Sequence, residues 1–209
     1  MTKTITRLFD DYSDAKAALA DLERLGVPHD AISIVANNAD GAHGDATAAL
    51  GDANDHGDVS RGVSTGAAVG GVGGLLAGLG LLAIPGLGPI VAAGWLASTA
   101  VGVGIGAAGG AATGTIVGAL KEAGHTDDEA HVYSEGVRRG GTLLSARVDD
   151  SLVSDAEAAL DRNRSVDATT RGTSYRQDGW SRFDDTAPAY TQDEVAAERN
   201  RYRTTPTAY

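Results

Sequence analysis

Two stretches of the sequence contain the residue types of known ligand sites. Gly104, Gly106 and Gly109 have the spacing of the dinucleotide-binding fingerprint, and Asp127 follows about 20 residues further on, where an acidic residue would bind the ribose. That fingerprint needs a strand ending at its first glycine, whereas these glycines belong to a longer four-residue repeat. We therefore expect no nucleotide site, and we expect no cofactor of another kind.

The second stretch is the acidic segment 40–61, which contains the triplet His-Gly-Asp twice. From Asp52 to Gly57 it begins like a calcium-binding loop, but the position that needs a bidentate glutamate is Val63. Surface loops of this composition are usually solvated. We therefore predict no metal site in this segment.

The remaining histidines do not indicate catalysis. They are His29, His125 and His131. None of them has a Ser, Asp or Glu at a spacing that suggests a proton relay. We therefore predict that the protein has no catalytic residues.

The charge balance narrows the classes of partner. The 209 residues include 17 Lys and Arg against 28 Asp and Glu, which gives a formal net charge of −11. A nucleic-acid partner is excluded because such a chain does not neutralise phosphates. The absence of cysteine excludes disulfides and thiolate metal ligands. Residues 1–14 hold charged side chains and no apolar run, so we expect no cleavable signal peptide.

Between Arg61 and Lys121 the sequence contains no ionisable side chain, and its glycines recur every fourth residue. A four-residue step follows a ridge of a helix surface, and a ridge without side chains lets two backbones approach closely. We therefore interpret the block as a glycine zipper between two helical arms. The ladder glycines are Gly62, Gly66, Gly70, Gly74, Gly78, Gly102, Gly106, Gly110, Gly114 and Gly118.

A turn at 84–89 joins the two arms, because proline and glycine both interrupt regular structure. Its residues are Pro85, Gly86, Gly88 and Pro89. As a helix, each arm is long enough to cross the roughly 30 Å of a bilayer's hydrocarbon core. Membrane lipid is therefore the expected partner. Two alternatives stay open, namely a soluble oligomer whose hairpin forms the subunit interface and a pore-forming hairpin.

The flanking segments repeat one pattern of strand, helix and strand. Apolar alternation predicts strands at 3–9, 31–36 and 142–148, with a weaker strand around Val166. The helix after the first strand contains SDAKAAL, and the helix after the third contains SDAEAAL, which match at six of seven positions. We interpret this as a duplicated βαβ unit in a ferredoxin-like plan.

Two further segments complete the chain. Thr126 and Glu129 have the spacing of a capping box, which predicts a short helix that ends before Gly140. The residues from 171 onward are polar and lack apolar periodicity, so we predict a disordered tail. Its spaced aromatic residues can be partner contacts, a role that the sequence leaves open.

The predicted organisation has five parts. They are a first βαβ half at 1–39, an acidic His/Asp loop at 40–61, a glycine-zipper helical hairpin at 62–120, a short helix with the second βαβ half at 121–170, and a disordered tail at 171–209.

Three segments carry a family resemblance. They are RGVSTGAA at 61–68, AIPGLGPIVAAG at 83–94 and YSEGVRRGG at 133–141. Over 3–170 the chain resembles bacterial general stress proteins of the heat-induced or low-temperature-induced kind. The resemblance implies a role in stress responses and an association with membranes, and it supplies no catalytic residues.

The sequence thus predicts an α+β protein in which a ferredoxin-like duplicated βαβ module is interrupted by a long glycine-zipper α-helical hairpin. We expect a non-enzymatic stress-response protein that associates with the membrane through this hairpin and forms a homo-oligomer. Its modules are expected on the cytoplasmic side of the membrane, with a cytoplasmic protein as the alternative. The sequence identifies no small-molecule substrate.

Overall fold

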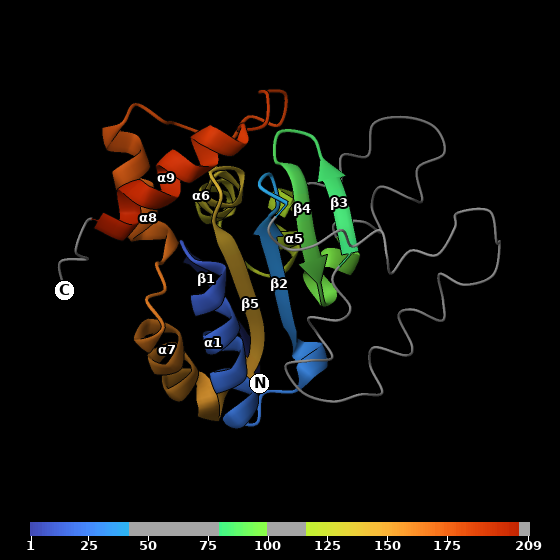
Figure 1. Cartoon of the computed structure of the whole chain (residues 1–209). Helices are drawn as coiled ribbons and strands as arrows, with labels where there is room; N and C mark the ends of the chain where they lie inside the picture. The colour runs from blue at the N-terminus through green and yellow to red at the C-terminus, as the bar shows by residue number, and fades with distance from the viewer. Residues whose placement is uncertain (42–79, 100–115, 205–209) are drawn as a thin grey trace, which may run out of the picture.

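The computed structural model describes residues 1–41, 80–99 and 116–204. Its centre is a five-stranded antiparallel sheet with the strand order β1-β5-β2-β4-β3 (Figure 1). The strands are β1 (Thr2–Phe9), β2 (Ile32–Asn37), β3 (Gly80–Ile84), β4 (Gly88–Ala93) and β5 (Thr142–Asp149). Helices pack against this sheet, which confirms the predicted α+β class.

The helices lie before, between and after the strands. A short helical turn at 95–99 follows β4. The longer helices are α1 (Tyr12–Arg24), α5 (Ile116–Glu122), α6 (Asp127–Arg138), α7 (Val153–Arg162), α8 (Ala168–Gln177) and α9 (Gln192–Thr204), and the 3-10 turns are η1 (His29–Ala31) and η3 (Asp150–Leu152).

The paired strands β2 and β5 come from the two segments that flank the uncharged block. Helix α1 connects β1 to β2, but these two strands are separated in the sheet by β5, which pairs with both. Beyond α7, Val166 exchanges two backbone hydrogen bonds of 2.8 and 2.9 Å with Leu8 of β1. The strands predicted at both ends of the chain are therefore confirmed, although the weak one around Val166 is a single bridge.

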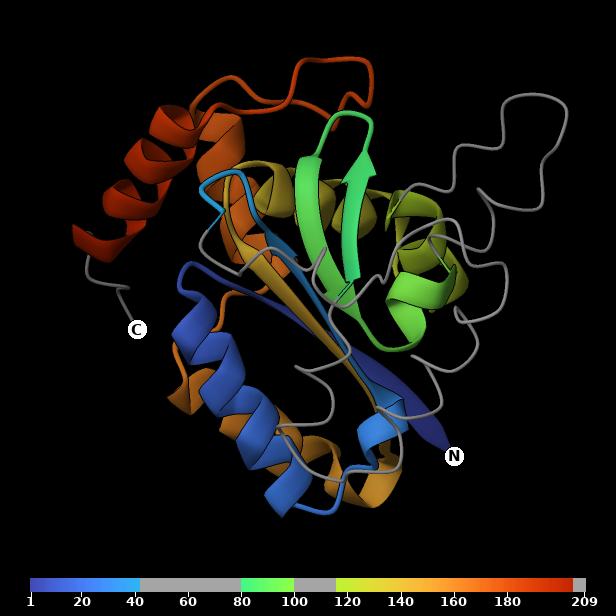
Figure 2. The same ribbon diagram turned by 45° about the vertical axis from the view of Figure 1, so that its right-hand side comes forward.

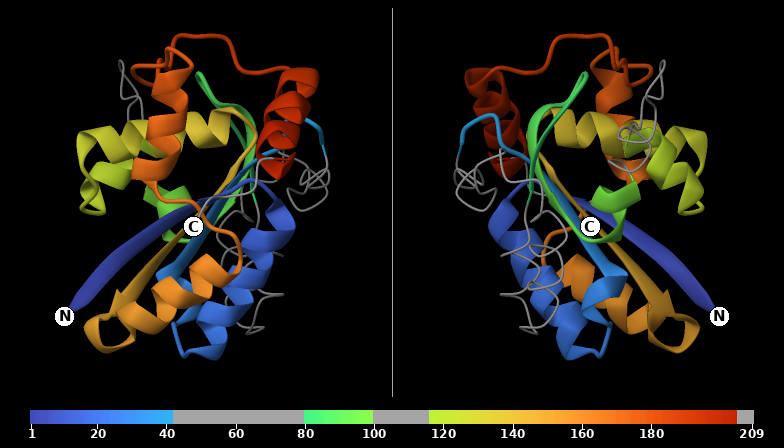
Figure 3. Two further views of the ribbon diagram at one scale, coloured as in Figure 1. Left: turned by 90° about the vertical axis from the view of Figure 1, so that its left-hand side faces the viewer. Right: turned by 90° about the vertical axis from the view of Figure 1, so that its right-hand side faces the viewer.

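Helices lie on both faces of the sheet (Figure 3), and each face has its own hydrophobic core. Phe9 and Ile34 point to the face that α1 and α7 cover, where Leu19 and Leu160 are buried. The opposite face carries Leu8, Val35 and Leu143, which pack against α5, α6 and α8. All six residues of β2 are buried, because the strand lies between neighbours and both of its faces are covered.

The predicted helical hairpin is wrong for residues 80–93. The turn lies where it was expected, with positive φ at Gly86 and Gly88, but Gly88 and Pro89 already belong to β4. The segments on either side of the turn are strands β3 and β4 rather than helices. The physical reason is that β4 pairs with the second edge of β2, from Asn37–Ile90 to Ile34–Ala93, and so completes backbone hydrogen bonds that an isolated apolar helix would leave unmade on β2.

The predicted disorder of the tail is also wrong, because most of 171–204 is structured. Helix α8 runs through Tyr175, and α9 follows after a loop. Tyr175, Phe183 and Val195 are 1%, 6% and 0% exposed, so three widely spaced side chains anchor the segment to the domain. In Figure 2 the loop between α8 and α9 passes beyond the turn of β3 and β4.

The capping box of α6 is confirmed. The Thr126 hydroxyl accepts a hydrogen bond from the Glu129 amide, and the Glu129 carboxylate accepts one from the Thr126 amide at 2.9 Å. Gly140, at φ +103°, follows the end of the helix as predicted. Among the residues that the structure describes, no helix has the length and apolar character that crossing a bilayer requires.

We expect Gly94→Ala to destabilise the domain strongly. Gly94 has φ +87°, and a Cβ there would collide with the carbonyl oxygen of Ile32 and lie 2.8 Å from the Ser33 Cα. The free energy of unfolding, measured with urea, should fall by about 2 kcal/mol more than in Gly26→Ala. Gly26 has a similar φ of +90° but open space around it. Equal losses for the two variants would contradict the close packing of the end of β4 against β2.

Candidate functional site

The ladder glycines do not form the candidate site. All of them except Gly118 lie outside the described residues, so their packing stays a prediction. Gly118 lies in α5, and there it lines a cavity. The turn residues Gly86 and Gly88 pack against the loop that follows α8, since a Cβ on either would collide with Asp185 or Ala189.

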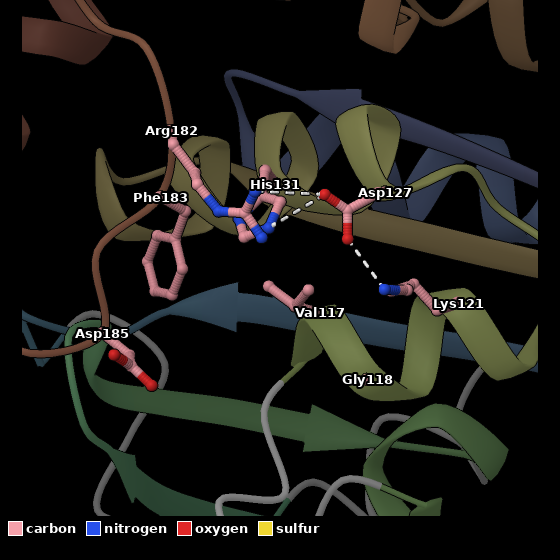
Figure 4. A pocket seen from close by; sticks show the side chains of 8 residues that line it. All are labelled: Val117, Gly118, Lys121, Asp127, His131, Arg182, Phe183 and Asp185. Carbon is pink, nitrogen blue, oxygen red and sulfur yellow. Dashed lines mark hydrogen bonds and ion pairs between the residues drawn. The ribbon is translucent and has the colours of Figure 1, made fainter.

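This cavity, of about 400 Å³, is the candidate site (Figure 4). It lies between α5, the start of α6 and the loop after α8. The lining residues are Val117, Gly118, Lys121, Asp127, His131, Arg182, Phe183 and Asp185.

Local structure explains how these three segments meet. Helix α5 ends near Gly124, whose φ of +98° turns the chain sharply, and the Thr126 cap then starts α6. Lys121 in the last turn of α5 therefore faces Asp127 in the first turn of α6. The third wall is fixed by Phe183, which is 6% exposed and belongs to the core beneath.

Asp127 is the centre of the charged groups. The Lys121 ammonium donates a hydrogen bond of 2.7 Å to its Oδ1, and the Arg182 guanidinium lies 3.3 Å from its Oδ2. The hydrogen bond from Lys121, followed by the charges of Lys121 and Arg182, holds the pKa of this carboxyl below its usual value. Asp127 is therefore ionised at neutral pH, although its own side chain is about half exposed.

His131, one turn further along α6, is the unusual member of the site. Its side chain is 10% exposed, and neither ring nitrogen makes a hydrogen bond. The nearest carboxylate, Asp127 Oδ2, is 3.6 Å from Nε2, which is too long for one. Burial, and then the charge of Arg182, lowers the pKa of His131, so the imidazole is neutral, with one donor and one acceptor that are buried without a partner.

A second histidine takes part in a network that the sequence analysis missed. His125 Nε2 lies 2.7 Å from the Thr6 hydroxyl, which lies 2.9 Å from the Ser145 hydroxyl. Glu129 approaches the other ring nitrogen of His125 at 3.7 Å. The Tyr133 hydroxyl donates to the Thr6 carbonyl at 2.7 Å, and burial raises the pKa of Tyr133 to about 12, so the hydroxyl keeps its proton.

This network contains the residue types of a catalytic relay, but it is buried between α6 and the sheet and therefore supports the fold. Thr6 and Ser145 are 1% and 0% exposed, and neither lines the cavity described above. The network joins α6 to β1 and β5 by satisfying polar groups that the sheet buries. No sequence spacing could reveal it, because Thr6 lies 119 residues from His125 and 139 from Ser145.

Arginine side chains hold the tail against the domain. The Arg139 guanidinium lies 4.3 Å from the ring centre of Tyr175, and that of Arg171 lies 3.8 Å from the ring centre of Tyr202. Arg171 also binds the Asp10 carboxylate with hydrogen bonds of 2.7 and 2.8 Å. The sequence left open whether the aromatic residues of the tail contact a partner, and the rings of Tyr175 and Tyr202 lie against arginines of the same chain.

Comparisons with known proteins leave the family unassigned. No protein-family model, no curated protein and no solved structure matches the chain. Within 1–41, 80–99 and 116–204, no group of three or more His, Asp or Glu side chains is placed to hold a metal ion.

We expect His131→Leu to stabilise the protein. The substitution removes two buried nitrogens that make no hydrogen bond, so the free energy of unfolding at pH 7 should rise by about 1 kcal/mol. His125→Leu is the matched control, because this histidine is hydrogen-bonded to Thr6 and its loss should lower the free energy of unfolding by a similar amount. Urea unfolding measures both.

The free energy of unfolding of His131→Leu should exceed that of the wild type by a growing amount as the pH falls. In the unfolded chain His131 takes up a proton near pH 6.5, while its lowered pKa keeps the folded form neutral to lower pH. The wild type therefore loses stability below about pH 6.5, and the variant does not have this loss. A difference that narrows between pH 7 and pH 5.5 would mean that the folded protein holds His131 charged.

Proposed function

We propose that the protein is a non-enzymatic stress-response protein whose structured domain binds a small polar molecule in the cavity beside α5 and α6. The single observation that supports this proposal best is His131, a buried imidazole with no hydrogen bond that lines a cavity large enough for a guest. Buried polar groups normally have a partner, and a bound molecule would supply one. The stress-response role rests on the family resemblance of the sequence.

Binding without conversion is the simplest function for this lining. Of the described residues around the cavity, none is Ser, Thr, Cys or Tyr, so His131 has no hydroxyl or thiol beside it to activate. The Lys121 side chain is already engaged by the Asp127 carboxylate, to which it donates a hydrogen bond of 2.7 Å. The cavity therefore suits recognition.

We further propose that the scaffold is a ferredoxin-like module with additions. Support comes from the order of the elements, since β5 lies between β1 and β2 and Val166 bridges the outer edge of β1. This is where a ferredoxin-like plan has its third and fourth strands, and α1 and α7 share one face as its two helices do. In this reading, the candidate site is built by the segments added on the other face, which are α5, α6 and the tail.

A second proposed function is self-association and membrane attachment through the glycine-rich stretches 62–78 and 102–114. The support is the sequence, which keeps every charge out of the block and repeats glycine every fourth residue. Because 80–93 form strands, this proposal differs from the helical hairpin that the sequence predicted. The two stretches are separated by a β-hairpin that belongs to the domain, so they are not the arms of one continuous helical hairpin.

We expect a small polar ligand to raise the melting temperature. A panel of short carboxylates, amines and amino acids would be screened by thermal unfolding, where a ligand at ten times its Kd adds about 1.4 kcal/mol. That gain corresponds to a rise of roughly 3–6 °C for a chain of this size, at 2–4 °C for each kcal/mol. Val117→Phe should abolish the rise because the ring enters the cavity, whereas Val153→Phe, on the other face, should keep it. An equal rise in both variants, or none in the wild type, would contradict the binding proposal.

For the second function, we expect the wild type in the membrane pellet after detergent-free lysis and in oligomers after crosslinking. Changing Gly70 and Gly110 together to Leu should abolish the oligomers, because the added bulk lies on the ladder. The matched control changes Ala68 and Ala108 to Leu, which lie off the ladder and should leave the oligomers intact. Recovery of the wild type as a soluble monomer would end this proposal, and it would leave the binding proposal untouched.

A further inference from the structure

The charges around the cavity are separated into two ends. Figure 4 shows Lys121 and Asp127 on one side, Phe183 and Asp185 on the other, and His131, Val117 and the guanidinium of Arg182 between them. This separation carries an inference about the ligand, which rests on the proposed binding function.

The first end has one positive charge in excess. Lys121 and Arg182 share a single counter-charge, the Asp127 carboxylate, at 2.7 and 3.3 Å. An ammonium has three hydrogen-bond donors and a guanidinium five, so both side chains keep donors after their contact with Asp127. This end suits a carboxylate, which either side chain could bind through a charge-assisted hydrogen bond.

The second end has one negative charge in excess. Within the described residues, the Asp185 carboxylate makes no ion pair and no hydrogen bond, although the side chain is only half exposed. Its backbone is held in place against the turn of β3 and β4, where a Cβ on Gly86 would lie 2.7 Å from the Asp185 Cα. The ring of Phe183 stands beside it, and an aromatic face next to a carboxylate favours a cation.

Neither a simple anion nor a simple cation balances both ends. The four charged side chains of the lining sum to zero, so a single ion would leave one end uncompensated. A free anion is disfavoured further by the net charge of −11 on the chain. A molecule with opposite charges at its ends would compensate both, and its middle would lie beside neutral His131.

We propose that the ligand of this cavity is a small zwitterion, with its carboxylate at Lys121 and Arg182 and its ammonium at Asp185. Its middle lies against Val117 and His131. The class is that of short amino acids.

Titration calorimetry with three matched compounds tests this assignment. γ-Aminobutyrate carries both charges, butyrate only the carboxylate and n-butylamine only the ammonium. We expect γ-aminobutyrate to bind the wild type at least about tenfold more tightly than either of the other two, since each charge-assisted contact is worth roughly that factor. β-Alanine and ε-aminocaproate then show which charge separation fits best.

Variants locate the two charges separately. Asp185→Asn should weaken γ-aminobutyrate and n-butylamine about tenfold and leave butyrate unchanged, and Lys121→Gln should weaken γ-aminobutyrate and butyrate instead. Asp193→Asn, which removes the same charge from α9, is the control and should change none of the three affinities.

The outcomes separate this inference from the proposed function. Butyrate binding as tightly as γ-aminobutyrate, with no effect of Asp185→Asn, would show an anion site and overturn the zwitterion assignment. If none of the three compounds binds while another member of the thermal panel stabilises the protein, the zwitterion assignment is wrong and the binding function stands. If nothing in the panel stabilises the protein, both proposals fail.

Discussion

The burial of both faces of the central sheet is the constraint on which the rest of this structure depends. Strand β2 is buried along its whole length, and β5 carries Leu143 and Leu144 to opposite faces. Helices α1 and α7 cover one face only. The other face needs a second layer, because exposing Leu8, Val35 and Leu143 to water would cost about 1.5–3 kcal/mol for each side chain. Helices α5, α6 and α8 supply that layer, and the candidate site lies within it.

The covering layer also explains the ionic groups in the tail. Helix α8 has a polar sequence and too few apolar side chains to bind by hydrophobic burial alone. Its Arg171 is 3% exposed, yet the guanidinium is compensated by Asp10 and by the face of the Tyr202 ring. Burial of an arginine is tolerated only with such partners. The tail is therefore held by a few apolar anchors together with arginine–aromatic contacts, rather than by an apolar stripe.

Local sequence patterns predicted the parts of this fold that depend on local interactions. The alternation around Ile5 and Leu144 predicted strands, and the pair Thr126 and Glu129 predicted the start of α6, because these signals act over a few residues. The apolar run at 80–93 was misassigned, since a short apolar run fits a buried strand as well as a helix. The pairing of Val35 with Ala92 decides between them, and that pairing is not visible in either segment alone.

In the candidate site, too, local contacts could be predicted from the sequence and contacts between distant segments could not. Lys121 and Asp127 lie six residues apart across a helix–helix turn, so their contact was within reach of sequence reasoning. Arg182, Phe183 and Asp185 come from a loop after α8, and the polar composition of that region predicted disorder instead. The buried state of His131 was equally hidden, because it results from the tail packing over α6.

The site is therefore assembled from segments that the chain brings together only when the tail is docked. A ligand that contacts Arg182 or Asp185 binds the docked form, because both side chains belong to the loop between α8 and α9. By thermodynamic linkage, such a ligand stabilises docking of the loop by the same free energy with which docking strengthens its binding. Phe183 connects the ligand cavity to the docked loop, because it lines the cavity and is also buried in the core on the α6 face. For such a ligand, occupancy of the cavity and docking of the loop would therefore be coupled, and each would strengthen the other.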